Sequence, residues 1–253
     1  MTETILFSTI TVSYNSEKTI SRTIESLLKQ SINNIEYIII DGNSTDKTVE
    51  IIKSFEHVFS KKKIKYTWIS ERDQGIYDAF NKGLKLASGK WISFLGSDDY
   101  YLPNALNTYN KHLSKLKQDV DFIHSIVNVE DKKVISDAWN WSKFKRSMNI
   151  AHVGAFHNKD YFMKYGFFNT NYKIAGDYEL LLRAKDKLKT YYFQEVTAFM
   201  SDEGVSNKQV EKVYEESTQI KIDIGSTSWL IAKFDYYLWI FKYKVKKMIN
   251  AIV

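Results

Sequence analysis

The sequence contains no cysteine, which excludes disulfide bonds and thiolate chemistry and is consistent with a reducing compartment. Its start lacks a basic segment followed by a long apolar one, so we expect no secretory signal there. No uncharged apolar run approaches the roughly 18 residues that a membrane-spanning helix needs. The chain has a single proline, no Pro- or Gly-rich linker and no internal repeat, so nothing marks a boundary between domains.

Motifs for several kinds of chemistry are also absent. Neither G-x-x-x-x-G-K-[ST] nor G-x-G-x-x-G occurs, so neither class of phosphate-binding loop is supported. There is no H-E-x-x-H, and the five histidines show no spacing typical of zinc ligands. The net charge of +6 is compatible with nucleic acid, anionic lipid or a phosphorylated small molecule as a partner, and it does not choose among them.

Over its first hundred residues the sequence alternates between apolar, strand-like runs and helical segments. Strands are predicted at residues 6–13, 36–42, 64–70 and 90–96, and helices at 14–31, 44–55, 75–87 and from Pro103 onward. In the helix over 75–87, the apolar residues at helical spacing, predicted to face the core, are Ile76, Phe80, Leu84 and Ala87. Continuously apolar strands separated by helices predict a parallel sheet that is covered on both faces.

Polar clusters follow all four predicted strands. They are Tyr14–Asn15, Asp41–Asp46, Ser70–Asp78 and Ser97–Asp99. Ligands of parallel α/β sheets bind beyond the carboxyl ends of the strands, where these clusters are expected to meet. For one cluster alone a polar turn is the better explanation, but four clusters on one edge favour a binding site.

Two adjacent carboxylates, Asp98 and Asp99, end the fourth strand, and like charges this close need a compensating partner. Mg²⁺ or Mn²⁺ is one such partner, because it accepts one or two protein carboxylates and completes its shell with substrate phosphates and water. Such an ion offsets the charge that develops on a departing diphosphate. The alternative is that the two aspartates cap the helix near Pro103, and the pattern alone leaves both interpretations open.

From residue 120 onward the alternation loosens. A hairpin is predicted from residues 119–129 and 132–138, a strand at 149–158, and a helix at 175–187 with Asp177 near its start. His152 and His157 flank the strand at 149–158, and their odd separation predicts that they lie on opposite faces, so that only one lines a cleft. One α/β domain with a second, mixed half fits this pattern better than two independent domains.

Four segments resemble, in order and spacing, the family-2 glycosyltransferases of the GT-A fold: "TVSYN", "DGNSTDKT", "SERDQGIYDAFNKGLKLASGKWISFLGSDD" and "KIAGDYELLLR". The similarity covers roughly residues 5 to 200. It implies an α/β fold of GT-A type, with a Rossmann-like, mostly parallel sheet flanked by helices and a mixed acceptor-side half. It also implies transfer of a hexose or N-acetylhexosamine from a nucleotide diphosphate sugar, with UDP expected, to an acceptor hydroxyl. The transfer inverts the anomeric centre and uses Mn²⁺ or Mg²⁺.

The resemblance also implies roles for individual residues. The residues implied to bind the nucleotide sugar are Val12 and Tyr14, which flank the base, Asp41, which hydrogen-bonds it, and Asp73, Gly75, Asp78 and Lys82 on the ribose and diphosphate side. Asp99 is the implied metal ligand, and Asp98 supports the ribose or the metal. For Lys82, a surface ion pair with Asp78 four residues earlier is an equally good explanation.

Asp177 matches the catalytic base of the family. Displacement at an anomeric carbon needs the acceptor oxygen deprotonated as it attacks, and a carboxylate opposite the leaving group can accept that proton. Stabilisation of this carboxylate by its helix dipole is a compatible alternative, and Arg183 is expected to anchor the fold. Three departures from the family pattern are Gly176, where many relatives have an acidic residue, Gly96-Ser97, where a leading carboxylate is common, and Arg72, which replaces a frequent proline. The second departure leaves the number of metal ligands open.

The chain is thereby divided into a nucleotide-sugar-binding half (1–105), an acceptor-binding and catalytic-base half of the same domain (106–200) and a helical, basic and aromatic tail (201–253). In the tail, the apolar residues that cluster at helical spacing are Phe234, Tyr237, Leu238 and Phe241, and lysines crowd its end. Such a helix suits an anionic membrane surface, and packing on the core is the alternative. We expect a cytoplasmic enzyme, peripheral on the inner face of the cell membrane. It would glycosylate a lipid-linked saccharide acceptor during assembly of a bacterial surface polysaccharide such as O-antigen or capsule.

Two other function classes remain as alternatives. A non-catalytic, basic nucleic-acid-binding module accounts for the charge, but carboxylates at strand ends repel phosphate without a metal, so no nucleic-acid partner is expected. A sugar nucleotidyltransferase shares the need for nucleotide and metal. However, such an enzyme usually has a Gly-rich basic loop after its first strand, and "TVSYNSEKT" contains no glycine.

Overall fold

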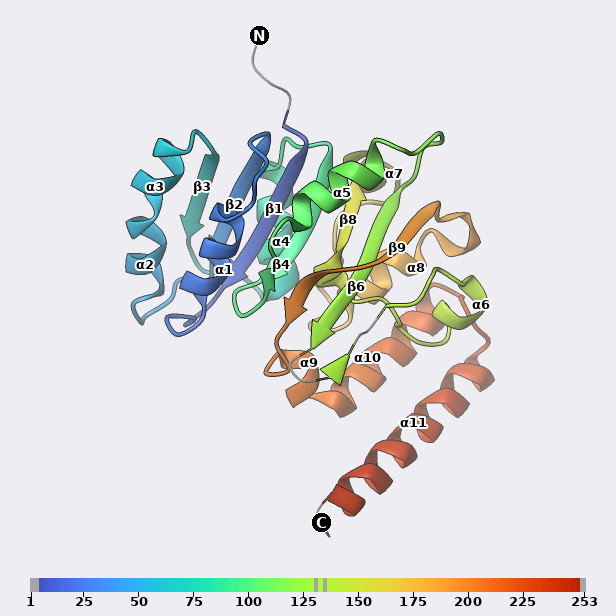
Figure 1. The fold of residues 1–253 in the computed structure, drawn as a ribbon. Helices are drawn as coiled ribbons and strands as arrows, with labels where there is room; N and C mark the ends of the chain where they lie inside the picture. The colour runs from blue at the N-terminus through green and yellow to red at the C-terminus, as the bar shows by residue number, and fades with distance from the viewer. Residues whose placement is uncertain (1–4, 130–131, 134–135, 251–253) are drawn as a thin grey trace.

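The structure is a computed structural model that describes residues 5–129, 132–133 and 136–250 (Figure 1). Its strands are β1 Phe7–Ser13, β2 Ile35–Asp41, β3 Lys65–Ser70, β4 Trp91–Gly96, β5 Tyr100–Tyr101, β6 Phe122–Val129, β7 Lys132–Lys133, β8 Ala155–Asn158 and β9 Thr190–Met200. Its helices are α1 Ile20–Leu28, α2 Thr48–Ser54, α3 Glu56–Lys61, α4 Ile76–Leu86, α5 Ala105–Leu113, α6 Trp141–Phe144, α7 Lys159–Tyr165, α8 Gly176–Leu182, α9 Val205–Lys208, α10 Val210–Asp223 and α11 Trp229–Asn250. Two 3₁₀ turns are η1 His152–Gly154 and η2 Lys185–Lys187.

Within the described residues the strands form one mixed sheet in the order β3-β2-β1-β4-β8-β6-β9-β5, with β7 paired to β6. The strands β3, β2, β1 and β4 are parallel neighbours, and β6 runs parallel to β9. The other pairs, β4–β8, β6–β8, β5–β9 and β6–β7, are antiparallel. The predicted parallel sheet and the predicted mixed second half are both confirmed.

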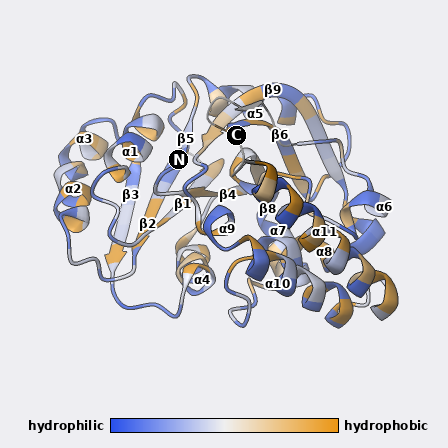
Figure 2. Cartoon of the chain, turned by 90° about the horizontal axis from the view of Figure 1, so that it is seen from below, coloured by the Kyte–Doolittle hydropathy of each residue, from blue (hydrophilic) through white to orange (hydrophobic). Residues whose placement is uncertain are grey.

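Helices cover both faces of the sheet, because its strands carry apolar side chains on both sides. Ile38 and Ile39 are consecutive in β2 and therefore point to opposite faces. Ile39 belongs to the buried cluster that contains Ile24 of α1, and Ile38 to the cluster that contains Phe80 of α4. Figure 2 shows α1 and α4 on opposite sides of β1 and β2.

The core-facing side of α4 differs by one residue from the prediction. Phe80, Leu84 and Ala87 are buried as predicted, but Ile76 is 40% exposed. Tyr77, which is 5% exposed, takes the buried position in the first turn instead. The inward face therefore runs through Tyr77, Phe80 and Leu84, at spacings of three and four residues that also lie on one side of a helix.

The predicted strand at 149–158 is shorter than expected, and its two histidines face each other. Only Ala155–Asn158 forms the strand β8, while His152 begins the 3₁₀ turn η1. The prediction of opposite faces is therefore wrong: the Nε2 atoms of His152 and His157 lie 2.8 Å apart. Burial lowers the pKa of both imidazoles, which favours a neutral pair in which one ring donates to the other.

The predicted hairpin after residue 120 is present where β6 pairs with β7. Residues 134–135 of its predicted second strand lie outside the described residues. Beyond β9 the chain ends in α10 and α11, which pack against each other, and α11 extends away from the sheet (Figure 1). Among the described residues, no helix is both long enough and apolar enough to cross a membrane.

Candidate active site

The parallel strands bring the predicted polar clusters to one edge of the sheet. Ser13, Asp41 and Ser70 are register partners at the ends of β1, β2 and β3. On the other side of β1, Val12 is the register partner of Gly96 at the end of β4. The predicted convergence of the strand ends is therefore what the structure shows.

The segment after β1 presents one aromatic side chain to solvent. Val12 is half-buried, and Tyr14 is 63% exposed. Asn15 has a φ of +49°, and its N–H donates to Oγ of Ser44 at 2.8 Å, which ties the segment to the loop after β2. The ring of Tyr14 approaches Gly42, where an added Cβ would lie 3.5 Å from its Cδ2 atom. Tyr14 therefore stands beside the end of β2.

Asp41 is fully buried and is held by three serine side chains. The hydroxyl of Ser13 donates to its Oδ1 at 3.1 Å and that of Ser70 to its Oδ2 at 2.7 Å. Ser44 donates through its hydroxyl to Oδ1 and through its N–H to Oδ2. Both carboxylate oxygens are therefore engaged, so a direct contact with a nucleobase would require one serine to give up its bond.

The loop between β3 and α4 is shaped by its own carboxylates. Oδ1 of Asp73 accepts the N–H of Gly75 at 2.8 Å, and Oδ2 of Asp78 accepts the N–H of Gln74 at 3.0 Å. Gly75 has a φ of +121°, a left-handed conformation that favours glycine, and it immediately precedes α4. A side chain at Gly42 would begin 2.6 Å from Oδ2 of Asp73, so this loop lies against the end of β2.

Lys82 braces the same loop. Its Nζ atom lies 2.8 Å from Oε1 of Glu71 and 2.8 Å from the carbonyl oxygen of Arg72, and 3.7 Å from Asp78. Partial burial acts to lower the pKa of Lys82, but the hydrogen bond and charge of Glu71 outweigh it and raise that pKa. The ion pair with Asp78, the alternative role for Lys82, is present but longer than the one with Glu71.

The two aspartates after β4 do not cap the following helix. Asp99 is 7% exposed; its Oδ2 accepts the N–H of Gly96 at 3.1 Å, and its Oδ1 accepts that of Ser201 at 2.9 Å. The helix α5 begins only at Ala105 and has no side-chain cap. Burial and the neighbouring charge of Asp98 raise the pKa of Asp99 to about 7.

Both carboxylates face one small volume that the glycine leaves open. A Cβ built on Gly96 would lie 2.5 Å from Oδ2 of Asp99 and 2.9 Å from Oδ1 of Asp98. A side chain at position 96 would therefore collide with these two carboxylates unless they moved. Two converging carboxylate oxygens fit a divalent cation. No cluster of three or more metal-ligating side chains occurs among the described residues, so phosphates and water would have to complete its shell.

Asp177 is half-buried in the first turn of α8, against an aromatic ring from α4. Its Oδ1 accepts the N–H of Tyr178 at 2.8 Å and lies 3.4 Å from the hydroxyl of Tyr77, which donates to the carbonyl of Ile174 at 2.6 Å. A Cβ on Gly176 would lie 2.7 Å from Cε2 of Tyr77. The ring of Tyr77 therefore fills the space that an acidic side chain at position 176 would need.

Several residues that hold this site carry no signal in the sequence. Arg22 of α1 donates from Nη2 to the carbonyl of Asp98 at 2.9 Å, and its guanidinium lies 4.7 Å from the ring centroid of Tyr100. Thr23 donates to the carbonyl of Asp99 at 2.7 Å. These contacts span more than seventy positions along the chain, so no local pattern reveals them.

Arg183 anchors the fold as expected. Its Nη2 atom lies 2.5 Å from Oε2 of Glu179, and its Nη1 atom donates to the carbonyls of Tyr165 and Phe167. Arg183 thereby ties the end of α8 to the turn that follows α7.

The model of one protein family, described as Glycosyl transferase family 2, matches residues 8–177. The PGL/p-HBAD biosynthesis glycosyltransferases of Mycobacterium bovis and Mycobacterium tuberculosis are 26% identical over 225 residues, which cover 87% of this chain and 86% of each relative. The chondroitin synthase of Escherichia coli is 29% identical over 182 residues, which cover 68% of this chain but only 25% of the synthase.

Solved structures share the fold at lower identity. TarS 1–349 of S. aureus, in complex with UDP-GlcNAc, has a TM-score of 0.69 and 19% identity, with 85% of this chain and 65% of that chain covered. The mannosyltransferase PcManGT from Pyrobaculum calidifontis, in complex with GDP-Man and Mn²⁺, has a TM-score of 0.68 and 14% identity, with 94% and 70% covered. This chain thus spans about two thirds of the TarS chain it matches. Because the family match extends over more than half of its length, this chain belongs to glycosyltransferase family 2, whose members transfer hexoses from nucleotide sugars with inversion.

Proposed function

We propose that this chain transfers a hexose or an N-acetylhexosamine from a UDP-sugar to a hydroxyl of a lipid-linked saccharide, using Mn²⁺ or Mg²⁺. The observation that carries the proposal is the pair Asp98 and Asp99, whose oxygens converge beside Gly96 at the edge where four parallel strands end. TarS in complex with UDP-GlcNAc supports the choice of UDP, and PcManGT with Mn²⁺ supports the metal. Both of these arguments rest on the fold that this chain shares with TarS and PcManGT.

The donor is assigned to residues 1–105. Its base lies against Val12 and Tyr14 near Asp41, and its ribose and diphosphate lie along the loop that Asp73, Gly75, Asp78 and Lys82 shape. Asp98 and Asp99 would hold the divalent ion. When bound, that ion offsets the negative charge that builds up on the departing UDP. An exposed Tyr14 beside a fixed loop suits a nucleotide that must enter and leave.

The acceptor hydroxyl loses its proton to Asp177. As the acceptor oxygen forms its bond to the anomeric carbon, the bond from that carbon to the UDP oxygen breaks, and UDP leaves with the bonding electrons. The N–H of Tyr178 and the hydroxyl of Tyr77 lie on Oδ1 of Asp177, so Oδ2 is the oxygen that takes the proton. Attack from the side opposite UDP accounts for inversion.

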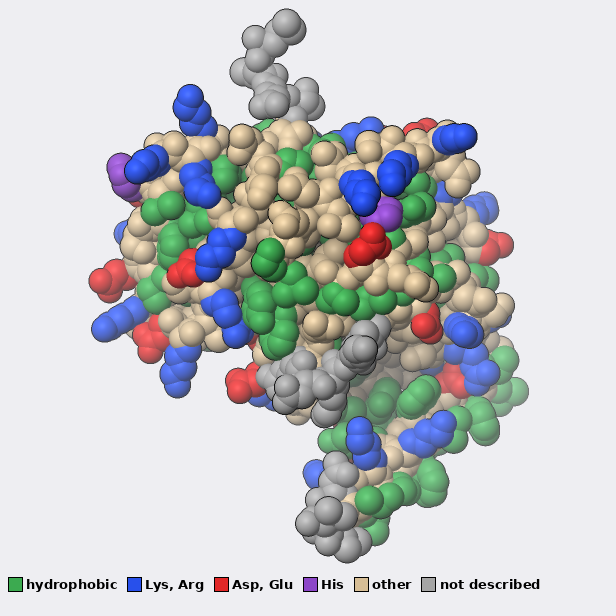
Figure 3. All heavy atoms as spheres, in the orientation of Figure 1, with side chains coloured by type: hydrophobic (Ala, Val, Ile, Leu, Met, Phe, Trp, Pro, Cys, Tyr) green, Lys and Arg blue, Asp and Glu red, His purple; other side chains and the backbone are tan. Residues whose placement is uncertain are grey.

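The helix α11 supports a membrane-bound acceptor. Its outward face carries exposed apolar side chains, namely Leu230, Phe234, Tyr237, Phe241 and Met248, each 62–72% exposed. Asp235, its one acidic residue, is 2% exposed and is paired with Arg146 and Lys221. What remains toward solvent is apolar and basic, which suits an anionic bilayer surface. Figure 3 shows hydrophobic and basic side chains together over α11.

The acceptor class follows from this surface and from the relatives. A helix that lies on the bilayer keeps the enzyme beside lipid-carried saccharides, and the similar proteins named for PGL/p-HBAD biosynthesis and for chondroitin synthesis also build glycoconjugates or polysaccharides. We therefore place the enzyme on the inner face of the cell membrane, in the assembly of a surface polysaccharide. The sequence-based alternatives, a nucleic-acid-binding module and a nucleotidyltransferase, find no support in the family match.

Removing the outward apolar side chains should release the protein from membranes. We expect the triple substitution Phe234→Ser, Phe241→Ser and Met248→Ser to weaken binding to phosphatidylglycerol-containing vesicles by at least about 100-fold, because each buried apolar side chain contributes about 1.5–3 kcal/mol. Co-sedimentation measures this loss. Met163→Ser removes an apolar side chain that is 81% exposed on α7 and should change nothing. Equal sedimentation of the triple variant and the wild type would exclude α11 as the docking surface.

Calorimetry with UDP tests the donor assignment. We expect UDP to bind more tightly with Mn²⁺ than with excess chelator, because an ion held by Asp98 and Asp99 would offset the negative charge of the diphosphate. We also expect UDP to bind more tightly than GDP under the same conditions. Equal affinity for the two nucleotides would overturn the choice of UDP, and equal affinity with and without metal would overturn the metal site.

A further inference from the structure

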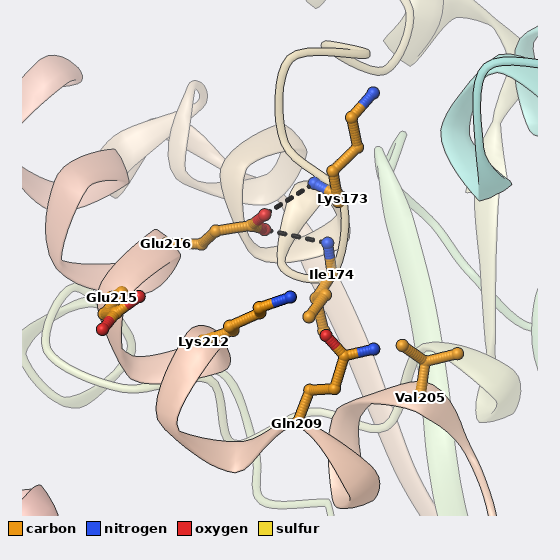
Figure 4. A pocket seen from close by; sticks show the side chains of 7 residues that line it. All are labelled: Lys173, Ile174, Val205, Gln209, Lys212, Glu215 and Glu216. Carbon is orange, nitrogen blue, oxygen red and sulfur yellow. Dashed lines mark hydrogen bonds between the residues drawn. The ribbon is translucent and has the colours of Figure 1, made fainter.

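A cavity of about 350 Å³ lies between the segment that leads into α8 and the helices α9 and α10. Its lining side chains are Lys173, Ile174, Val205, Gln209, Lys212, Glu215 and Glu216. Figure 4 shows Glu216 directed at the backbone of Lys173 and Ile174, while Glu215 lies apart from them with no hydrogen bond drawn. Ile174 is only three positions before Asp177, so this wall of the cavity is continuous with the candidate catalytic base.

Glu216 holds that wall through three consecutive backbone N–H groups. Its Oε1 accepts the N–H of Lys173 at 2.8 Å, and its Oε2 accepts those of Ile174 and Ala175 at 2.8 and 2.9 Å. Hydrogen bonds to an ionised carboxylate are stronger than those between neutral groups. One side chain of α10 thus fixes the three residues from which α8 and Asp177 continue.

The donor half holds the same segment from the other side. The hydroxyl of Tyr77 donates to the carbonyl of Ile174, and the Nζ atom of Lys173 donates to the carbonyl of Gln74 at 3.1 Å. Gln74 belongs to the loop assigned to the donor diphosphate. The segment 173–177 is therefore clamped between that loop and α10.

We propose that Glu216 is a positioning residue for the transfer reaction: it fixes residues 173–175 so that Asp177 keeps its carboxylate aimed at the acceptor hydroxyl. This inference rests on the proposed role of Asp177 as base. Glu216 lies outside residues 8–177, the part of the chain that matches the family model, so the clamp is a contribution of the C-terminal helices. The tail then completes the active site in addition to docking on a membrane.

Glu216→Gln tests the clamp with little change in shape. One carboxylate oxygen becomes an NH₂ group, so a donor faces the backbone N–H groups that need an acceptor. In the full-length protein we expect amide hydrogen exchange of residues 173–177 to accelerate, and kcat to fall about 10- to 100-fold with donor affinity unchanged. Glu215→Gln removes the neighbouring charge in the same cavity and should match the wild type in both measurements.

Glu216→Asp adds a graded test, because it keeps the charge but withdraws it by one methylene group. We expect an intermediate exchange rate and an intermediate kcat. If Glu216 contributed only to overall stability, kcat would not follow the exchange rate among variants of equal thermal stability. Unchanged exchange at residues 173–175 in Glu216→Gln overturns the clamp, and faster exchange with an unchanged kcat overturns the positioning role. A parallel Asp177→Asn variant that retains turnover would instead refute the base assignment, and hydrogen exchange would still decide whether Glu216 holds the segment.

Discussion

Asp177→Asn is expected to lower turnover by at least about 10²–10⁴-fold, the usual contribution of general-base catalysis, without loss of donor affinity. Asparagine keeps the shape and can still accept the N–H of Tyr178 through Oδ1, so α8 should start as before. It cannot take a proton from the acceptor. Steady-state turnover and calorimetry with the donor measure the two quantities separately.

A matched control for Asp177→Asn is Asp160→Asn, which removes a carboxylate from the first turn of another short helix, α7. This control should leave turnover unchanged. Near-normal turnover of Asp177→Asn would move the base elsewhere, and Glu179 is a poor substitute because it is 6% exposed and paired with Arg183. The role of Asp177 would then have to pass to a group outside α8.

Asp99→Asn should abolish most of the metal-dependent part of UDP binding. Asp99 and Asp98 supply the two oxygens that face the space beside Gly96, and an amide oxygen is a weaker ligand for Mn²⁺ than a carboxylate. We expect the ratio of UDP affinities with Mn²⁺ and with chelator to fall by more than about tenfold, at least the loss typical of supporting residues around metal sites. Calorimetry at both conditions measures this ratio.

Asp41→Asn separates a specific loss of metal-dependent UDP binding from a general loss of UDP binding at the strand ends. Asp41 lies at the end of β2, where its carboxylate binds three serines and no part of it faces Gly96. Its substitution should weaken UDP binding equally with and without metal. A metal ratio that falls in Asp41→Asn but not in Asp99→Asn would contradict the assignment of the metal ligands.

The strands and the strand-end clusters could be predicted from the sequence because both are local patterns. An apolar run followed by polar residues marks a strand and its end, and parallel register then sets Ser13, Asp41 and Ser70 side by side. The same local reasoning failed at His152 and Ile76. His152 lies in a 3₁₀ turn, where alternation does not apply, and the position expected for Ile76 is taken by Tyr77.

The contacts that shape the candidate site could not be predicted, because they join distant parts of the chain. Ser201 donates to Asp99 across 102 positions, and Glu216 reaches back 43 positions to Lys173. Two of the three departures from the family pattern that the sequence reveals lie at Gly96 and Gly176. Only the structure shows what lies against each glycine: the carboxylates of Asp98 and Asp99 against Gly96, and the ring of Tyr77 against Gly176.

The central claim is the transfer of a sugar from a UDP-sugar with inversion, and one measurement tests it most directly. The full-length protein is incubated with Mn²⁺, a membrane glycolipid fraction and a panel of radiolabelled nucleotide sugars, and the anomeric configuration of the product is assigned by NMR. We predict that a UDP-hexose or UDP-N-acetylhexosamine labels the lipid fraction with inverted configuration, and that Asp177→Asn abolishes the label. Transfer from no nucleotide sugar, or a product that retains the donor configuration, would contradict the account.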